Sequence, residues 1–396
     1  MLKSFMVKNY KSFRNEARLE FEAVDAGIYR EINTFPIKET NLLKSTLIYG
    51  ANSSGKSNLC NSIDFFRQVV KSGLQDIKPG VFSPFAFFEE ISTSVTFEIE
   101  FIINEILYVY RFETDGEVIL RESLHKKVKR KVAVFRRSIV KNEPNIFQPE
   151  FKFNYAKLNE KQLFIRIASD IGIPMAKDIM SFFEKIYFGN DNIEYTLLAS
   201  ESQNGFKKIN DRAALLMGCA DPDVDIMLID KEKILELGIE PEEANNPKFK
   251  RKFMSHAIYD VEGRNKGNML MSFDEFASSG TKRMYQLGRT ILKVLETGGV
   301  LVIDEIDEHL HPLLTRKIIS LFNSIDMNPY NAQLICTVHD VTLLDEAIRM
   351  DQIWIIEKDK FGCSALKSIC EFGENLQPQL LRNYLLGVYG GIPNIQ

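Results

Sequence analysis

The sequence lacks the patterns that mark secreted, metal-stapled and membrane-spanning proteins. Its five cysteines are scattered and form no CxxC pair, which fits reduced thiols better than a disulfide framework or a zinc site. No apolar run approaches the roughly 20 residues that a helix needs to cross a bilayer. Charges also interrupt the N-terminal segment too early for a signal peptide. We therefore expect a soluble, cytoplasmic protein that makes no membrane contact.

Internal repeats, low-complexity segments and sustained heptads are absent as well. The net charge of −4 argues against a generally basic nucleic-acid coat, although it allows a local basic patch. What remains is the composition of an ordinary globular protein, with 45% hydrophobic and 26% charged residues. A chain of 396 residues is long enough for one large domain or two modest ones.

The apolar pattern predicts an α/β fold, with a parallel core sheet, an antiparallel β subdomain and an inserted helical lobe. The expected strands and hairpins are 2–8, 17–22, 45–49, 94–112, 117–139, 300–303, 334–338 and 352–357. The expected helices are 56–70, 175–188, 231–238, 278–296 and 312–324. These elements predict an N-terminal lobe (1–140), a mainly helical insert (141–265) and a C-terminal lobe (266–396).

The turn between strand 45–49 and helix 56–70 fits the phosphate-binding pattern GxxxxGK[ST]. Glycines let successive N–H groups point at phosphate oxygens, and the start of the helix adds a partial positive charge. Lys56 is expected to bridge the β- and γ-phosphates, and Ser57 to ligate Mg²⁺. The alternative is a chance glycine turn, which the strand–turn–helix context disfavours. The predicted nucleotide-binding residues are Gly50, Ala51, Asn52, Ser53, Ser54, Gly55, Lys56, Ser57 and Asn58.

Two carboxylates follow the apolar run Val300–Ile303. A buried strand would deliver Asp304 and Glu305 to the edge of the sheet where ligands bind in open α/β folds. We expect Asp304 to hold Mg²⁺ and Glu305 to be the general base for the attacking water. The alternative is an acidic helix cap after a core strand. His339 ends another apolar strand and is either a third catalytic residue, contacting the γ-phosphate, or a structural histidine.

The order of these motifs resembles that of ABC-type ATPases of the RecF/SMC branch. The phosphate loop is followed by the segment Ser278–Arg283, then by Asp304 and Glu305, and then by His339. Further segments are similar to the AAA_15/AAA_21 group, which includes the RloA-like, OLD-like, Septu and PARIS ATPases of bacterial anti-phage and abortive-infection systems. These segments are Asn9–Phe13, Ser278–Arg283, Asp304–Pro312 and Tyr389–Pro393.

The resemblance implies ATP and Mg²⁺ as cofactors and a homodimer or higher homo-oligomer as the working state. Two heads would stack head-to-tail, so that a signature segment of one subunit contacts the γ-phosphate held by the other. The implied signature residues are Ser278, Ser279, Gly280 and Thr281, with Ser279 where the family pattern has glycine. His311 falls at the D-loop position. The glutamine that links Mg²⁺ to the helical lobe is unassigned, with Gln75 or the Ser83–Pro84 tract as candidates.

The resemblance also implies a function, namely an ATPase that senses a phage trigger and controls a separate effector. Because the stretch after His339 is too short for a Toprim domain, we expect the effector to be a Toprim or HNH nuclease encoded nearby. The alternative is a RecF-like ATPase that binds DNA in repair, and a third possibility is a scaffold that uses ATP only to dimerise. The basic tract 121–141 could bind DNA or RNA through Lys126–Lys131, or could be a solvated hairpin.

Overall fold

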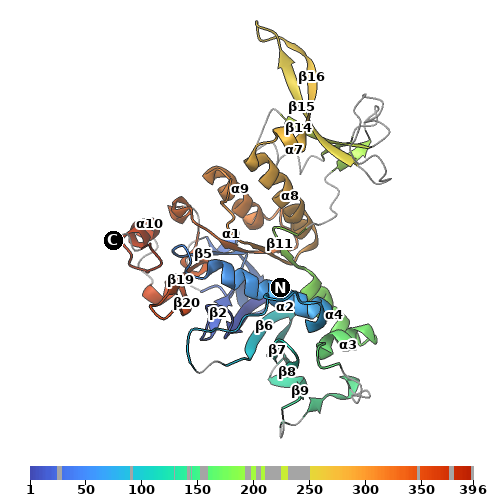
Figure 1. Cartoon of the computed structure of the whole chain (residues 1–396), viewed down its shortest axis with the longest axis vertical. Helices are drawn as coiled ribbons and strands as arrows, with labels where there is room; N and C mark the ends of the chain where they lie inside the picture. The colour runs from blue at the N-terminus through green and yellow to red at the C-terminus, as the bar shows by residue number, and fades with distance from the viewer. Residues whose placement is uncertain are drawn as a thin grey trace. The chain divides into compact units, whose positions relative to one another are not determined.

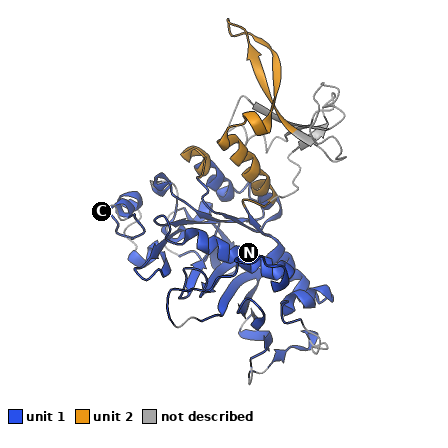
Figure 2. Ribbon diagram, in the orientation of Figure 1, with its two compact units in different colours: residues 1–188, 294–307, 316–396 blue, residues 189–293, 308–315 orange. Residues whose placement is uncertain are grey.

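In the computed structural model, the chain folds into two compact units (Figure 2). Unit 1 comprises Met1–Phe188, Val294–Asp307 and Arg316–Gln396, and unit 2 comprises Gly189–Lys293 and Glu308–Thr315. The residues described are 1–24, 29–89, 92–128, 130–140, 143, 145–151, 159–191, 198–201, 207–209, 224–230, 250–345, 348–373 and 379–393. Between 192 and 251 the description is limited to the backbone.

Unit 1 contains a seven-stranded antiparallel sheet with the strand order β10-β9-β8-β7-β6-β1-β2 (Figure 1). Buried and less buried side chains alternate along strands such as β6, because successive residues of a strand point to opposite faces. The strand bounds are Leu2–Lys8 (β1), Ala17–Glu20 (β2), Val95–Ile103 (β6), Ile106–Thr114 (β7), Ile119–Lys127 (β8), Lys131–Ser138 (β9) and Ile146–Phe147 (β10).

The second sheet of unit 1 is mostly parallel and has the order β11-β17-β18-β5-β19-β20. Its first five strands run parallel, and β20 pairs antiparallel with β19. Strands β5, β17 and β18 are buried along their whole length, which is typical of parallel strands covered on both faces. The bounds are Ser45–Tyr49 (β5), Ile186–Phe188 (β11), Val300–Ile303 (β17), Gln333–Thr337 (β18), Ile353–Lys358 (β19) and Ser364–Ser368 (β20).

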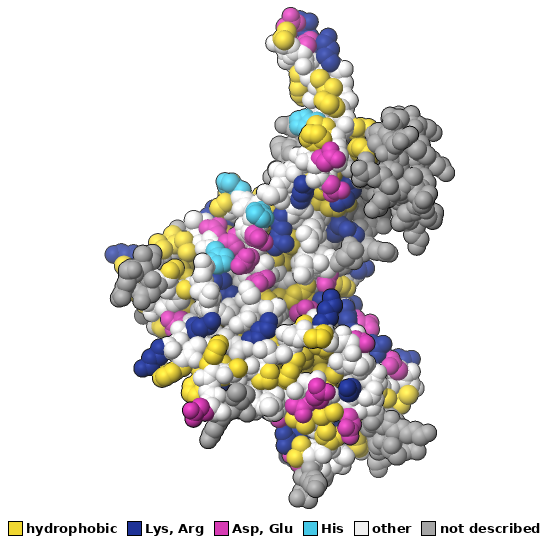
Figure 3. Space-filling view, viewed as in Figure 1, with side chains coloured by type: hydrophobic (Ala, Val, Ile, Leu, Met, Phe, Trp, Pro, Cys, Tyr) yellow, Lys and Arg dark blue, Asp and Glu magenta, His cyan; other side chains and the backbone are white. Residues whose placement is uncertain are grey.

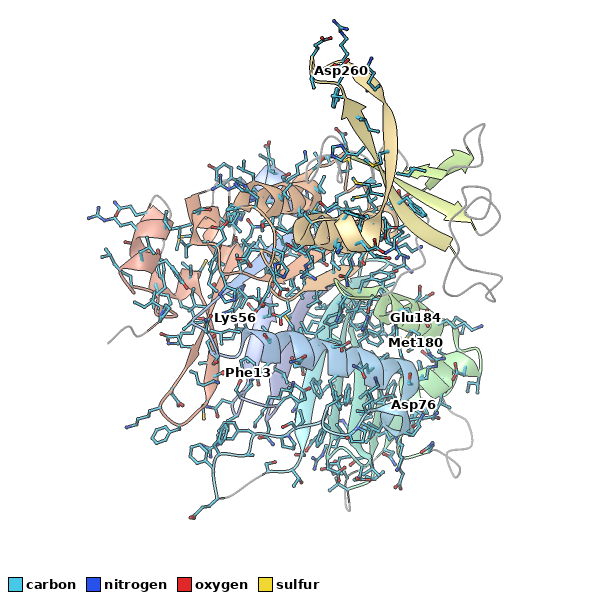
Figure 4. All side chains as sticks on the ribbon, turned by 45° about the horizontal axis from the view of Figure 1, so that its top comes forward. Phe13, Lys56, Asp76, Met180, Glu184 and Asp260 are labelled. Carbon is cyan, nitrogen blue, oxygen red and sulfur yellow. The ribbon has the colours of Figure 1, made fainter. Side chains whose placement is uncertain are left out.

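Helix α2 (Lys56–Ser72) packs its buried face against both sheets. Phe65 stacks on Phe97 of β6 with ring centroids 5.4 Å apart, and Phe66 stacks on Phe112 of β7 at 5.5 Å. Burying a phenylalanine side chain contributes about 1.5–3 kcal/mol, so these contacts hold the helix firmly. Lys56 therefore has a fixed position at the start of α2 (Figure 4).

The other elements of unit 1 are short. Helices α3 and α4 pack against one another, and α4 also contacts the antiparallel sheet. The bounds are Arg30–Asn33 (α1), Thr34–Ile37 (β3), Thr40–Leu43 (β4), Phe164–Asp170 (α3), Pro174–Glu184 (α4) and Leu380–Leu385 (α10).

Unit 2 contains a five-stranded antiparallel sheet with the order β12-β13-β14-β15-β16. Its longest strands, β15 and β16, form a hairpin whose turn is closed by Asp260, because Oδ1 accepts the N–H groups of Glu262 (3.0 Å) and Arg264 (2.8 Å). The end of this hairpin exposes hydrophobic, acidic and basic side chains (Figure 3). The bounds are Leu198–Glu201 (β12), Lys207–Ile209 (β13), Val224–Asp230 (β14), Lys250–Tyr259 (β15), Asn265–Ser272 (β16) and Phe273–Phe276 (α7).

The α/β fold class predicted from the sequence is confirmed, but the prediction of a mainly helical insert over 141–265 is wrong for the described residues. These hold strand β10, then α3 and α4, and then strands from β11 onward. The apolar run in β14 shows why, because a short run of this kind fits a buried strand and a helix equally well. The helix predicted over 231–238 lies outside the described residues. Helices α8 (Ser279–Thr297) and α9 (Pro312–Asn323) begin in unit 2 and end in unit 1, close to their predicted bounds.

Candidate functional site

The loop between β5 and α2 is held in a turn by side chains from distant parts of the chain. Gly55 has φ +118°, and a Cβ there would lie 2.5 Å from the Oγ of Ser364 and 2.8 Å from that of Ser12. The Ser364 hydroxyl donates to the Ser54 carbonyl (2.5 Å), and the Asn58 amide donates to the Ser12 hydroxyl (2.8 Å). Glycine is therefore required at position 55 both by its backbone conformation and by the lack of space for a side chain.

Lys56 is buried at the start of α2, with 5% of its surface exposed. Its Nζ donates to the carbonyls of Gly50 (2.7 Å) and Ala51 (3.2 Å) in its own loop. Burial lowers the pKa of the Lys56 ammonium below its usual value, while the negative charges of Glu305 and Asp304 oppose this shift. The lysine and the two predicted acids are thus electrostatic neighbours, although about 250 positions separate them along the chain.

The carboxyl end of β17 brings Asp304 and Glu305 beside the end of its parallel neighbour β18. The Thr337 hydroxyl donates to Asp304 Oδ1 (2.6 Å) and accepts the N–H of Glu305 (2.7 Å). Glu305 Oε1 lies 3.6 Å from His339 Nε2. The structure therefore brings the predicted acids and the predicted histidine together at one edge of the sheet.

A cavity of about 550 Å³ opens at this edge. Its volume lies within the range of small-molecule and cofactor sites. The side chains that line it come from the phosphate loop, from the loops after β17 and β18, and from the end of β19. The lining residues are Asn52, Ser53, Gly55, Lys56, Ser57, Asn58, Glu305, His339 and Lys358. The predicted site residues Gly50, Ala51, Ser54 and Asp304 do not line it.

Lys358 is a lining residue that the sequence analysis did not identify. It is the last residue of β19, which runs parallel to β5, so it ends at the same edge of the sheet as the phosphate loop. Its side chain is exposed. The sequence could have indicated Lys358, because it directly follows the predicted strand 352–357. Like Asp304, it lies at the carboxyl end of a strand, where ligands bind in open α/β sheets.

The chain was also compared with known protein families. A family model described as "AAA domain, putative AbiEii toxin, Type IV TA system" matches residues 45–345, from the start of β5 to beyond His339. The chain belongs to this family, AAA_21. The resemblance to the AAA_15/AAA_21 group is thereby confirmed. A search of curated proteins found no match.

Among solved structures, the SMC head domain from Thermotoga maritima is similar to this AAA_21 protein. The two are 15% identical in sequence, with a TM-score of 0.43, over 93% of this chain and 98% of the other. Among the described residues, no helix combines the length and the apolar character needed to cross a membrane.

The segment Ser278–Arg283, predicted to be the signature, and His311, predicted to lie in the D-loop, belong to unit 2 of this AAA_21 protein. Ser278 Oγ accepts the N–H of Thr281 (3.1 Å) and lies 2.8 Å from its hydroxyl, so Ser278 caps the start of α8. His311 Nδ1 accepts an N–H group at the start of α9 (3.2 Å). Contacts of Ser278, Ser279, Gly280, Thr281 and His311 with a nucleotide on a second subunit stay a prediction.

Neither candidate for the Mg²⁺-linked glutamine position lines the cavity. Gln75 lies in a short 3-10 turn (Leu74–Asp76), where its amide donates to the Ser72 carbonyl. The Ser83 carbonyl accepts the N–H of Lys11 (2.7 Å). Both assignments from sequence position are therefore unsupported.

Some basic residues of the tract 121–141 of this AAA_21 protein form ion pairs within the antiparallel sheet. Arg121 forms salt bridges with Glu113 and Glu143, both at 2.7 Å. Arg137 is buried 3.7 Å from Glu122, which is itself fully buried. These two arginines stabilise the sheet and do not form a free basic surface.

The remaining basic residues of the tract differ in exposure. Lys126 lies 3.8 Å from Glu150. The described residues Lys127, Arg130, Lys131 and Arg136 have exposed side chains. Lys129 and Lys141 lie outside the described residues. Nucleic-acid binding around Lys126–Lys131 stays a prediction.

Proposed function

We propose that this AAA_21 protein binds ATP with Mg²⁺ and hydrolyses it in the cavity at the edge of the parallel sheet. One observation carries the proposal: Lys56, Ser57, Glu305 and His339, from three separate segments of the chain, line a single cavity. A buried cation for phosphate, a hydroxyl for a metal ion, and a carboxylate beside an imidazole are the parts that phosphoryl transfer to water requires.

The residues at the cavity fit both ATP and Mg²⁺. The Ser57 hydroxyl and the Asp304 carboxylate are hard oxygen donors, which Mg²⁺ prefers. The buried Ser54 hydroxyl, in the loop between β5 and α2, has no hydrogen-bond partner among the described residues. The first N–H groups of a helix such as α2, which begins at the lining residue Lys56, have no acceptor within the helix and can bind an anion. Bound Mg²⁺ would neutralise negative charge on the β- and γ-phosphates.

Three of the lining residues have proposed roles in the reaction. Lys56 exchanges the carbonyls of Gly50 and Ala51 for the phosphate oxygens, which are stronger acceptors because they are charged. Glu305 orients the attacking water and accepts its proton. His339, 3.6 Å from Glu305, donates a hydrogen bond to the γ-phosphate.

We also propose that the working state is a homodimer or higher homo-oligomer. Ser278, Ser279, Gly280 and Thr281 of one subunit would contact the γ-phosphate held by the other, and His311 would reach across the interface. The position of Ser278 supports this, because the start of a helix attracts anions through its free N–H groups and its dipole. ATP would close the dimer and hydrolysis would release it.

For the cellular role, we propose a sensor or regulatory subunit of an anti-phage, abortive-infection system in which a phage trigger leads to release of a separate nuclease effector of the Toprim or HNH type. The family description, a putative AbiEii toxin of a type IV toxin–antitoxin system, supports a link to growth arrest. The role is tested by infecting two kinds of cells with phage: cells that carry this gene alone, and cells that carry it together with its neighbouring genes. Protection should require both partners, whereas toxicity of this chain expressed alone would contradict a separate effector.

Hydrolysis is tested with the purified protein, Mg²⁺-ATP and a phosphate-release assay. Glu305→Gln should lower kcat by about 100- to 1000-fold and leave ATP affinity nearly unchanged, because the base acts on the chemical step. Glu308→Gln, which changes a nearby exposed acid, is the matched control. Wild-type turnover in the Glu305→Gln variant would refute the assignment of Glu305, and an inactive wild-type protein would refute the proposed hydrolysis.

A further inference from the structure

Two side chains connect the loop after β17 to the loop after β18. Thr337 binds the first of these loops, and Asp307 binds the second. We infer that Thr337 and Asp307 are positioning residues that hold Glu305 and His339 together as one unit, an inference that rests on the proposed hydrolysis. Neither residue lines the cavity.

Thr337 fixes the backbone from which Glu305 projects. Its side chain is fully buried, and its hydroxyl accepts the Glu305 N–H (2.7 Å) while it donates to Asp304 Oδ1 (2.6 Å). Glu305 has φ +51°, a left-handed conformation that costs a non-glycine residue free energy unless its surroundings hold it. The bond to Thr337 provides such a constraint at the strained residue itself.

Asp307 fixes the backbone from which His339 projects. Its Oδ2 accepts the N–H groups of His339 (2.8 Å) and of Asp340 (2.6 Å). The Tyr49 hydroxyl donates to the Asp340 carbonyl (3.2 Å) from the other side. Because 41% of the His339 side chain is exposed, packing alone does not hold the ring, and its backbone anchors decide where it lies.

The two contacts act on the same pair of loops in opposite directions. Glu305, in the loop after β17, is held by the side chain of Thr337 in β18. His339 and Asp340, in the loop after β18, are held by the side chain of Asp307 in the loop after β17. A backbone bond from Ile306 N–H to the Thr337 carbonyl (3.1 Å) lies between them. A displacement of either loop therefore moves both the water-activating carboxylate and the phosphate-contacting imidazole.

The first test removes the Thr337 hydroxyl. Thr337→Val keeps the shape of the side chain but leaves the Glu305 N–H without its acceptor, and we expect kcat to fall about tenfold with little change in ATP affinity. Thr337→Ser should restore most of the rate. In a Glu305→Gln background, Thr337→Val should lower kcat much less than in the wild type, because only its bond to Asp304 Oδ1 is then left to act on the rate.

The second test removes the acceptor for the histidine loop. Asp307→Ala should lower kcat about tenfold, and Asp307→Asn, which keeps an oxygen acceptor, should lower it less. In a His339→Ala background, Asp307→Ala should have no further effect. Full additivity in either double mutant would overturn the inference, since it would mean that the two pairs act independently.

Amide hydrogen exchange of the nucleotide-free protein provides a readout that does not depend on turnover. Thr337→Val should speed exchange of the Glu305 amide about tenfold, and Asp307→Ala should do the same at His339 and Asp340. Unchanged exchange at all three amides would overturn the inference. An inactive wild-type protein would refute the proposed hydrolysis and this positioning role together, whereas an impaired Glu305→Gln variant beside a fully active Thr337→Val variant would refute the positioning role alone.

Discussion

The cavity at the sheet edge and the basic tract 121–141 are both rich in charge, but the structure uses that charge differently. In the cavity, Lys56, Glu305 and Lys358 come from three separate segments and line one open space. In the tract, Arg121 and Arg137 lie within one hairpin and contact acids of the same sheet. Charges that converge from distant segments thus indicate a site better than charges that are merely close in sequence.

Glu122 shows how the charges of the tract are used inside the sheet. It is the one acid in the tract, and it is fully buried. Its carboxylate accepts the N–H groups of Phe164 (2.6 Å) and Ile165 (2.9 Å) at the start of α3 and the Tyr110 hydroxyl (2.9 Å). Burial raises the pKa of Glu122, and the Arg137 charge opposes that shift. The hairpin therefore anchors a helix through a buried ion pair.

The largest effect should follow from Lys56→Ala. The variant loses a buried cation that faces the cavity, so the Kd for ATP should rise about 100-fold, as expected for strong hydrogen bonds between charged groups. Calorimetric titration with ATP measures this. Lys71→Ala, at the exposed far end of the same helix, is the control and should bind normally. Normal binding by Lys56→Ala would show that the cavity is not the nucleotide site.

The two adjacent arginines of β9 separate structural charge from surface charge. Arg137→Met removes the partner of Glu122 and the hydrogen bond to the Gln162 carbonyl (2.9 Å). We expect it to lower the free energy of unfolding by about 3–5 kcal/mol in urea titrations, the usual cost of leaving a buried charge unpaired. Arg136→Met, at an exposed neighbour, should change it by less than about 0.5 kcal/mol. Equal effects of the two variants would contradict the buried role.

Lys358→Ala tests whether the nucleotide-binding site includes the end of β19. Because the Lys358 side chain is exposed, its attraction for phosphate is screened, and the Kd for ATP should rise only about two- to fivefold. The same calorimetric titration applies, with Lys360→Ala as a neighbouring exposed control. No change in affinity would exclude Lys358 from the nucleotide site.

The smallest effect should come from charge reversal on the tract. The four exposed cations among the described residues of the tract would by themselves make the logarithm of any DNA affinity fall with the logarithm of salt concentration at a slope of about −4. Lys127→Glu combined with Lys131→Glu should then change little beyond weak binding, as measured by fluorescence anisotropy. A much steeper slope that this double variant abolishes would favour the RecF-like alternative.

The sequence by itself determined the elements that carry strong local signals. Strand 45–49, the phosphate loop, strand 300–303 and the helix after Ser278 were predicted close to their observed bounds, because each combines an apolar run with a specific turn or cap. The insert was not predictable in the same way. The pairing of its strands β14 and β15 depends on contacts between segments that the local pattern does not specify.

Only the tertiary structure decided which charged residues remain available for chemistry. The local pattern treats Arg136 and Arg137 alike, yet one is exposed and the other is buried against Glu122. The pattern also gives no reason to single out Thr337. Burial and hydrogen bonding depend on which strands become neighbours, and in a parallel sheet those neighbours come from distant parts of the chain.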